Sequence, residues 1–190
     1  MSGALHSRVV VVTRPERQAA PFLKMLRAAG AEPVAFPSLV IEPVVLEPGV
    51  RGRFEPDEFD WVIYASANAV EQGLAQLPRP RRARLATVGL ATARALEGHG
   101  LAVGAVPATT RDSEGLLAHP EFADVRGRRG LILRGVGGRE VLHQALVARG
   151  AEVEVAELYR RAVAEPTVAS RARRGRGSCA RPCSTALALA

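Results

Sequence analysis

The chain has 190 residues, of which 47% are hydrophobic, and a formal net charge of +7. This size and composition allow a substantial buried core and argue against intrinsic disorder. No apolar run approaches the roughly 20 residues that span a bilayer, and residues 1–8 lack the pattern of a secretory signal. We therefore expect a cytoplasmic protein with no membrane partner.

The positive charge is concentrated near the C-terminus. Residues 167–190 carry five arginines and no acidic residue, whereas the first 166 residues carry 21 basic and 19 acidic groups. Both cysteines, Cys179 and Cys183, also fall in this segment. The rest of the chain therefore offers neither a disulfide framework nor a four-ligand zinc site, and we expect no metal and no other cofactor.

The N-terminal residues predict one βαβ unit. Residues 9–12 form a continuous apolar strand, and the following helix runs from Pro15, which suits a first helical turn, to Ala29. Gly30 is placed to end that helix in the left-handed conformation, and residues 34–36 predict the next strand. We assign residues 1–37 to the first part of a first domain.

A proline-containing segment then separates two domains. Residues 38–56 read as an extended connector rather than a helix, because prolines flank and interrupt the run 39–46. Beyond it, residues 57–160 predict an inserted α/β domain with a five-stranded parallel sheet. Its strands are predicted at 61–65, 85–88, 103–106, 130–133 and 153–158, and its helices at 67–77, 91–98, 113–118 and 139–149.

The first domain is topologically incomplete, because two strands and one helix do not form a stable layered domain. Residues 161–190 read as a return connector followed by an atypical arginine- and alanine-rich tail. This composition favours a frameshifted or misannotated end over a disordered basic extension. The predicted fold is α/β, with two flavodoxin-like doubly wound parallel-sheet domains joined by a two-strand connector, the first of them incomplete.

Seven segments in a fixed order carry a family resemblance. They are VVVVTRP (9–15), FPSLVIEP (36–43), DWVIYASANAV (60–70), TVGLATARAL (87–96), SEGLL (113–117), LILRGVGGREVL (131–142) and ELYRR (157–161). Over about residues 8–163 the chain resembles uroporphyrinogen-III synthases. The resemblance implies a monomeric, cofactor-free lyase of haem biosynthesis, which cyclises the linear tetrapyrrole hydroxymethylbilane with loss of water and inversion of ring D.

Such a substrate is a polyanion, and turns that lead from a strand into a helix offer backbone N–H groups to carboxylates. Ser66 begins such a turn, where it is either a helix cap alone or a cap and a ligand contact, and the resemblance favours contact. In the next unit, Gly89 permits close backbone approach, and the alternative there is plain packing. The substrate-binding residues that the resemblance implies are Thr13, Arg14, Ser66, Ala67, Asn68, Gly89, Leu90, Ala91, Thr92, Ser113 and Arg134.

Tyr159 ends the last predicted strand, where the chain leaves the second domain. The resemblance implies that it assists departure of the substrate hydroxyl as a hydrogen-bond donor, since a phenol keeps its proton at neutral pH. Without the resemblance, a tyrosine at a strand end is a core residue with a solvated tip. Tyr159 is the predicted catalytic residue.

Four further features allow weaker or open interpretations. The segment RGVGGRE (134–140) resembles a phosphate-binding loop, but Glu140 stands where a third glycine belongs and would repel a phosphate. Arg134 and Arg139 suit either a carboxylate-binding rim or an ion pair with Glu140. The histidines at 99, 119 and 143 share no metal-ligand spacing and are expected at the surface. The basic tail alone suggests nucleic-acid binding. The chain has few aromatic residues and no recognisable reading helix, so this is the weakest alternative.

The family is expected to use residues of both domains. We therefore predict little or no turnover from residues 1–190 alone. The alternatives are an inactive fragment or a non-catalytic, flavodoxin-like module that binds acidic ligands.

Overall fold

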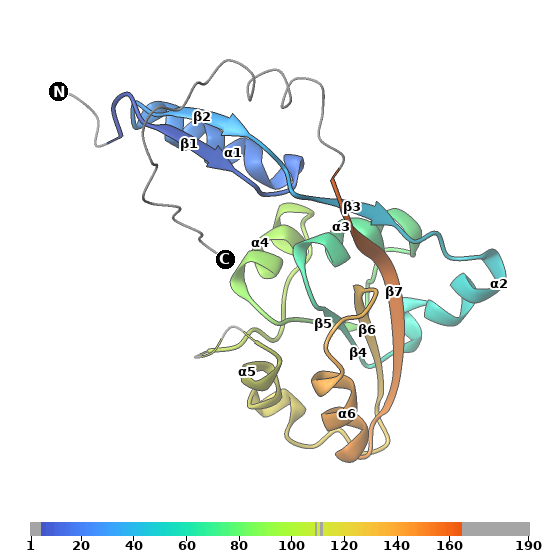
Figure 1. The fold of residues 1–190 in the computed structure, drawn as a ribbon. Coiled ribbons are helices and arrows are strands. Elements are labelled where there is room, and N and C mark those ends of the chain that lie inside the picture. The colour runs from blue at the N-terminus through green and yellow to red at the C-terminus, as the bar shows by residue number, and fades with distance from the viewer. Residues whose placement is uncertain (1–4, 109, 111, 165–190) are drawn as a thin grey trace. The chain divides into compact units, whose positions relative to one another are not determined.

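The structure is a computed structural model that describes residues 5–108, 110 and 112–164. The described residues divide into two units, one of residues 5–40 with 162–164 and one of residues 41–161 (Figure 1). The predictions for the basic tail and for both cysteines lie outside the described residues. Within the described part, no helix has the length and apolar character needed to cross a membrane, and no three His, Cys, Asp or Glu residues are grouped to hold a metal ion.

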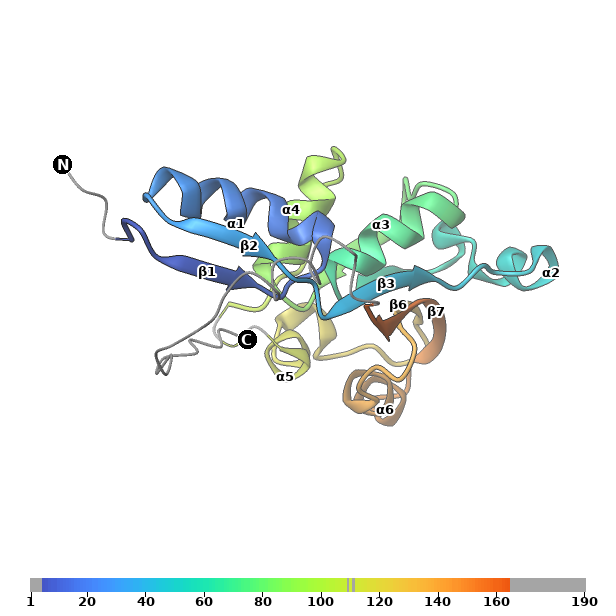
Figure 2. The same ribbon diagram turned by 45° about the horizontal axis from the view of Figure 1, so that its top comes forward.

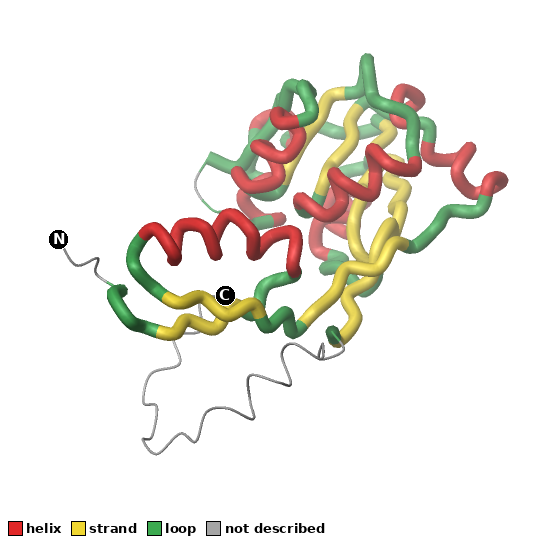
Figure 3. The backbone as a smooth tube through the Cα atoms, turned by 90° about the horizontal axis from the view of Figure 1, so that it is seen from above, coloured by secondary structure: helices red, strands yellow, loops and turns green. Residues whose placement is uncertain are grey.

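The first unit contains β1 (Val9–Val12), α1 (Glu16–Ala28) and β2 (Glu32–Ala35). The two strands pair in parallel, and α1 lies along them (Figure 3). The apolar face of α1 packs Ala19 and Leu26 against Val12. Gly30 has a φ of +85°, so it ends the helix in the left-handed conformation that the sequence predicts.

The predicted connector at residues 38–56 is only partly extended. β3 (Leu39–Pro43) is extended, but the strand ends at Pro43, and α2 (Pro48–Arg51) and two 3₁₀ turns (Gly52–Phe54 and Pro56–Glu58) follow. Pro48 occupies the first turn of α2, where its missing N–H is tolerated. The expectation of a connector without helix is therefore wrong for residues 48–51.

The second unit is built on a sheet in the strand order β3-β7-β6-β4-β5. The remaining strands are β4 (Trp61–Tyr64), β5 (Arg84–Thr87), β6 (Arg129–Gly135) and β7 (Glu152–Val163). β4 pairs in parallel with β5 and β6, and β6 pairs in parallel with β7. The α/β class with parallel strand pairing is therefore confirmed.

The predicted strand at residues 103–106 is reduced to a single parallel bridge between Ala86 and Ala105. The amide groups of Gly104 and Ala105 both donate to the carbonyl oxygen of Leu85, at 2.8 and 3.2 Å. Two donors on one carbonyl interrupt the regular ladder. The fifth place in the sheet is instead taken by β3, at the opposite edge.

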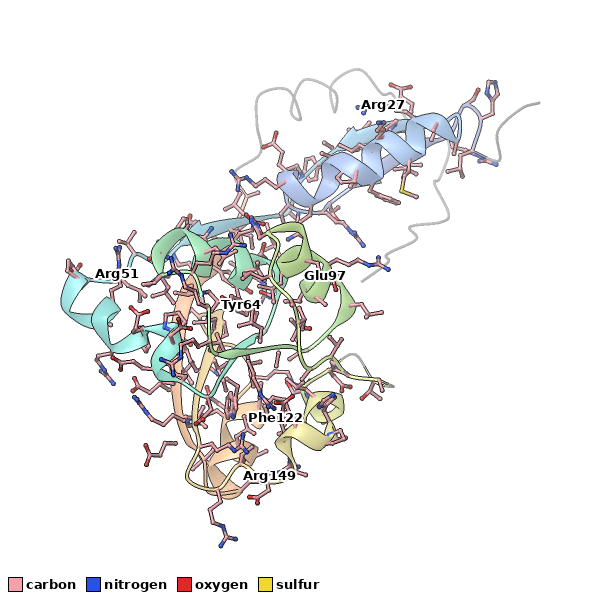
Figure 4. The ribbon with its side chains drawn as sticks, turned by 180° about the vertical axis from the view of Figure 1, so that it is seen from behind. Arg27, Arg51, Tyr64, Glu97, Phe122 and Arg149 are labelled. Carbon is pink, nitrogen blue, oxygen red and sulfur yellow. The ribbon has the colours of Figure 1, made fainter. Side chains whose placement is uncertain are left out.

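Helices cover both faces of this sheet (Figure 2). α3 (Ala67–Gln76) and α4 (Leu90–Gly98) lie on one face, and α5 (Ser113–Leu117) and α6 (Val141–Ala148) lie on the other. Side chains of β4 alternate between the two layers. Val62 and Tyr64 join the core under α3 and α4, and Trp61 packs with Phe122 in the other core (Figure 4).

The Trp61 ring needs a glycine on the next strand. Trp61 is paired with Gly130 at the start of β6, and a β-carbon on Gly130 would lie 1.8 Å from Cη2 of the indole. The same ring meets Phe122 edge-on, with ring centroids 5.4 Å apart. This cluster fixes the amino end of the central strands.

Candidate functional site

A cavity of about 370 Å³ opens at the carboxyl ends of the strands in the second unit. Residues in or directly after four strands line it, namely Ala65 and Ser66 after β4, Val88 after β5, Arg134 and Gly135 in β6, and Tyr159 in β7. The strand order reverses here, because β5 lies on one side of β4 and β6 on the other. Ligands of open parallel sheets bind at such a reversal, outside the carboxyl ends of the strands.

Ser66 and Tyr159 meet in this cavity. Ser66 caps α3, since its Oγ accepts a hydrogen bond from the Ala69 amide at 3.1 Å. The same Oγ lies 2.9 Å from the hydroxyl oxygen of Tyr159. Both residues are candidates from the sequence, and the structure brings them together although 93 positions separate them.

A bulge in β7 aims Tyr159 at this position. Arg134 pairs with Glu157, but the next residue, Gly135, pairs with Tyr159 and not with Leu158. The extra residue puts Leu158 and Tyr159 into the same core cluster, although successive residues of a regular strand face opposite sides. Bulges of this kind re-aim a side chain beside a site.

The Tyr159 ring is held from two further sides. A β-carbon on Gly135 would lie 2.7 Å from the ring carbons Cε2 and Cζ, so only glycine leaves the ring its place. The guanidinium carbon of Arg161 lies 5.8 Å from the ring centroid, within cation–π range. The sequence reading missed both roles. The glycine at the end of β6 can be identified from the sequence, but its contact with the Tyr159 ring cannot, because the ring lies on another strand.

Arg134 holds the turn that follows β6. Its Nη2 donates to Glu140 and to Glu157, the latter at 3.2 Å, and its Nη1 lies 3.3 Å from the carbonyl oxygens of Gly138 and Arg139. The hydrogen bond from Arg134 is the main reason that the pKa of Glu140 is lowered. The ion pair with Glu140 considered for this arginine is therefore present, and the guanidinium is directed at its own turn.

The N-terminus of α5 forms another part of the wall. Asp112 caps this helix by accepting the Gly115 amide at 2.8 Å, and this hydrogen bond is the largest cause of the lowered pKa of Asp112. Arg139 extends from the turn after β6 and pairs with Glu114 at 2.8 Å. Three arginines and one aspartate therefore line the cavity, and Arg139 and Arg161 are its exposed cations.

The remaining predicted residues lie close to the cavity or in the other unit. Ser113 lines the cavity with Ser66, Arg134 and Tyr159. The first turns of α3 and α4, directly after lining residues, contain the others of the second unit, namely Ala67, Asn68, Gly89, Leu90, Ala91 and Thr92. Thr92 is 5% exposed, and its amide donates to Gly89. Thr13 and Arg14 belong to the first unit, where Thr13 accepts from Ser38 and Arg14 lies over Phe22.

A family model described as uroporphyrinogen-III synthase HemD matches residues 20–176. The chain belongs to the uroporphyrinogen-III synthase family. Its sequence is 36% identical over 158 residues to the uroporphyrinogen-III synthase of Salmonella typhimurium and 34% identical over 158 residues to that of Escherichia coli. In each case the match covers 80% of this chain and 64% of the relative. The chain thus spans less than two thirds of the length of these relatives.

Solved structures agree with this membership. A mutant uroporphyrinogen III synthase from Thermus thermophilus superposes with a TM-score of 0.56 at 25% identity, over 83% of this chain and 64% of that one. The uroporphyrinogen-III synthetase of Helicobacter pylori has the same TM-score at 17% identity, over 88% and 67% of the two chains, and supports the fold alone. The family resemblance found in the seven segments is therefore confirmed.

Proposed function

We propose that this chain serves in uroporphyrinogen-III synthesis, in which hydroxymethylbilane loses its terminal hydroxyl and closes with inversion of ring D. The observation that carries the proposal is the Ser66–Tyr159 hydroxyl pair, set in a cavity at the strand-order reversal of a sheet from this family. As finer parts of the proposal, the second unit is flavodoxin-like and the protein acts as a monomer on a small-molecule tetrapyrrole.

Substrate carboxylates are held at the rim of the cavity. Arg139 and Arg161 are exposed there, and the N-terminus of α3, capped by Ser66, lies at the same cavity. An exposed arginine can exchange a protein carboxylate for one on a ligand at little net cost, because surface ion pairs are worth about 0–1 kcal/mol. Arg134 has a different part in this scheme, since its bonds within the turn keep Gly135 beside Tyr159.

Tyr159 is the proposed catalytic residue. When the bond between the terminal methylene carbon and its hydroxyl breaks, the departing oxygen gains electron density and accepts a hydrogen bond from the phenol. A positioned donor of this kind typically contributes about 10²–10⁴-fold to a rate. The hydroxyl takes up the phenolic proton and leaves as water, while the lone pair of the adjoining pyrrole nitrogen stabilises the methylene carbon. A pyrrole carbon from the other end of the tetrapyrrole then bonds to the methylene carbon, and the proton that the closing macrocycle loses from a pyrrole carbon restores the neutral phenol.

Binding is the first test. Anaerobic calorimetric titration of residues 1–190 with uroporphyrinogen III is expected to show saturable binding. The double variant Arg139→Gln and Arg161→Gln should bind about tenfold more weakly, with a loss of stability of no more than about 1–2 kcal/mol, because it removes one surface ion pair and one exposed cation–π contact. As a matched control, Arg81→Gln removes an exposed arginine at the amino end of the strands and should not alter affinity. Absence of saturable binding by the unmodified chain would refute the proposal.

Turnover needs a longer protein if our prediction of low activity for residues 1–190 is right. We would append the C-terminal third of the Salmonella relative to residue 164 and supply hydroxymethylbilane enzymatically. Chromatography of the oxidised products separates the type III isomer from the type I isomer that forms spontaneously. The chimera should give type III product, and Tyr159→Phe should lower kcat by about 10²-fold or more. Saturable binding with type I product alone would instead favour the non-catalytic module.

A further inference from the structure

The hydrogen bond between Ser66 and Tyr159 has two possible directions, because each hydroxyl can donate to the other. The direction matters for any ligand in the cavity. If Tyr159 donates to Ser66, its only proton is used inside the protein. If Ser66 donates to Tyr159, the phenolic proton remains available to the cavity.

The surroundings of Ser66 favour donation by the serine. Its Oγ already accepts the amide proton of Ala69 at 3.1 Å, at the N-terminus of a ten-residue helix. The positive end of the helix attracts the oxygen of the Ser66 hydroxyl and turns its proton away, towards Tyr159. Accepting one hydrogen bond also makes a hydroxyl a stronger donor, because the two bonds polarise one another.

Either direction leaves one hydroxyl proton over, so the direction decides which of the two residues offers a proton to the cavity. Among the described residues, the hydrogen bonds of Ser66 Oγ are those to Ala69 and Tyr159. If Tyr159 donated, the serine oxygen would accept twice and the unused proton would be that of Ser66. If Ser66 donates, both of its bonds are made within the protein, and the unused proton is that of Tyr159, which lines the cavity.

The tyrosine itself has little freedom to take another arrangement. Its side chain is buried, Gly135 and Arg161 confine the ring, and the bulge in β7 fixes its direction. We propose that Ser66 is a positioning residue that donates its proton to the Tyr159 oxygen and so directs the Tyr159 O–H into the cavity. The consequence, a proton held ready for the leaving hydroxyl, rests on the function proposed above.

Raman spectroscopy can read this direction without any ligand. The intensity ratio of the tyrosine Fermi doublet distinguishes a phenolic oxygen that accepts from one that only donates. The chain has two tyrosines, so the variant Tyr64→Phe leaves Tyr159 as the single source of the signal. In this background we expect the signature of an accepting oxygen. The signature of a hydroxyl that only donates would overturn the proposal.

Two substitutions at Ser66 complete the test. Ser66→Thr keeps a hydroxyl and should leave the Raman ratio unchanged, whereas Ser66→Gly keeps a favourable helix cap, removes the hydroxyl and should shift the ratio. Similar unfolding of the two variants shows that α3 is intact, and an unchanged ratio in Ser66→Gly contradicts the proposal. Because no ligand is used, the result is independent of whether the chain binds uroporphyrinogen III.

Discussion

Strand β6 has a glycine near each end, and each glycine makes room for an aromatic ring from a neighbouring strand. Gly130 faces Trp61 of β4, and Gly135 faces Tyr159 of β7. The two pairs look alike in the sequence, where each is a glycine and a distant aromatic residue. The surroundings of the two pairs differ, and so do the roles of the two rings.

At the amino end, the Trp61 ring is enclosed. Trp61 is 1% exposed, its indole packs on Phe122, and its Nε1 lacks a hydrogen-bond partner within the described structure. At the carboxyl end, the Tyr159 ring is equally buried, but its hydroxyl reaches Ser66 at the wall of a cavity. A close glycine–aromatic contact therefore indicates tight packing, and only the polar tip of the ring decides whether the contact also serves a site.

Gly130→Ala should have the largest effect on stability. The new methyl would lie within 2.3 Å of three indole atoms, so the ring or the strand must move. Overpacking of this kind destabilises proteins by about 1–3 kcal/mol or more, and the enclosed ring puts this case at the upper end. Urea unfolding followed by fluorescence of the single tryptophan measures it directly.

Gly98→Ala is the matched control, because a β-carbon there meets no atom within 4 Å. Gly98 ends α4, and alanine at a compatible position stabilises a protein by about 0.4–1 kcal/mol. If both variants lose stability equally, the enclosed ring at Gly130 is not the cause.

The next largest effect concerns Tyr64, the buried tyrosine one residue from the cavity wall. Burial raises its pKa from 10.0 to about 12. The unfolded chain then ionises first, so the stability contributed by the neutral phenol is complete below pH 10 and is lost as the pH rises towards 12. Two pKa units correspond to a loss on the order of 2 kcal/mol relative to Tyr64→Phe. Urea unfolding of both proteins at pH 9 and pH 11.5 checks this, and parallel losses would contradict it.

Gly135→Ala should separate binding from stability. The methyl would press on Cε2 and Cζ of Tyr159 and displace its hydroxyl from Ser66. We expect about tenfold weaker binding of uroporphyrinogen III, or ~1.4 kcal/mol, with a smaller loss of stability than Gly130→Ala. Gly98→Ala again serves as the control. Wild-type affinity in Gly135→Ala would show that the ring position is unimportant for the site.

Much of the second unit follows from local patterns in the sequence. The apolar run at 61–64 and the turn after it predict β4 and the start of α3, because a central strand is buried on both faces. Tyr159 was predicted to end its strand, but β7 continues to Val163. The start of α3 at Ser66, in contrast, follows the prediction. β4 and the start of α3 depend on residues close in sequence.

The missed features depend on pairing between distant strands. The contact of Gly135 with Tyr159 requires the register shift between β6 and β7, which no local pattern reveals. The bonds of Arg134 within its turn require the same register, since Glu157 is its strand partner. For the same reason the single bridge at Ala105 was predicted as a full strand.

The smallest predicted effect concerns Asp57, at the amino ends of the strands, whose carboxylate accepts hydrogen bonds from backbone amides of the protein. Its Oδ1 accepts the amides of Arg81, Arg82 and Ala83, at 2.9, 2.8 and 3.2 Å. The hydrogen bond from Arg82, followed by that from Arg81, lowers the pKa of Asp57 below 3.8. The carboxylate therefore stabilises the fold above about pH 4, and this contribution is lost as the pH falls through the lowered pKa.

Asp57→Asn should flatten the acid end of the stability profile, because the amide oxygen still accepts but carries no charge. Asp57→Ala removes the acceptor as well and should lower stability at pH 7 too. Thermal unfolding between pH 3 and pH 7 distinguishes the two variants. Both should bind uroporphyrinogen III like the parent chain. A loss of affinity in Asp57→Asn would mean that the amino ends of the strands also serve the ligand, and the contrast between the two ends of β6 would fail.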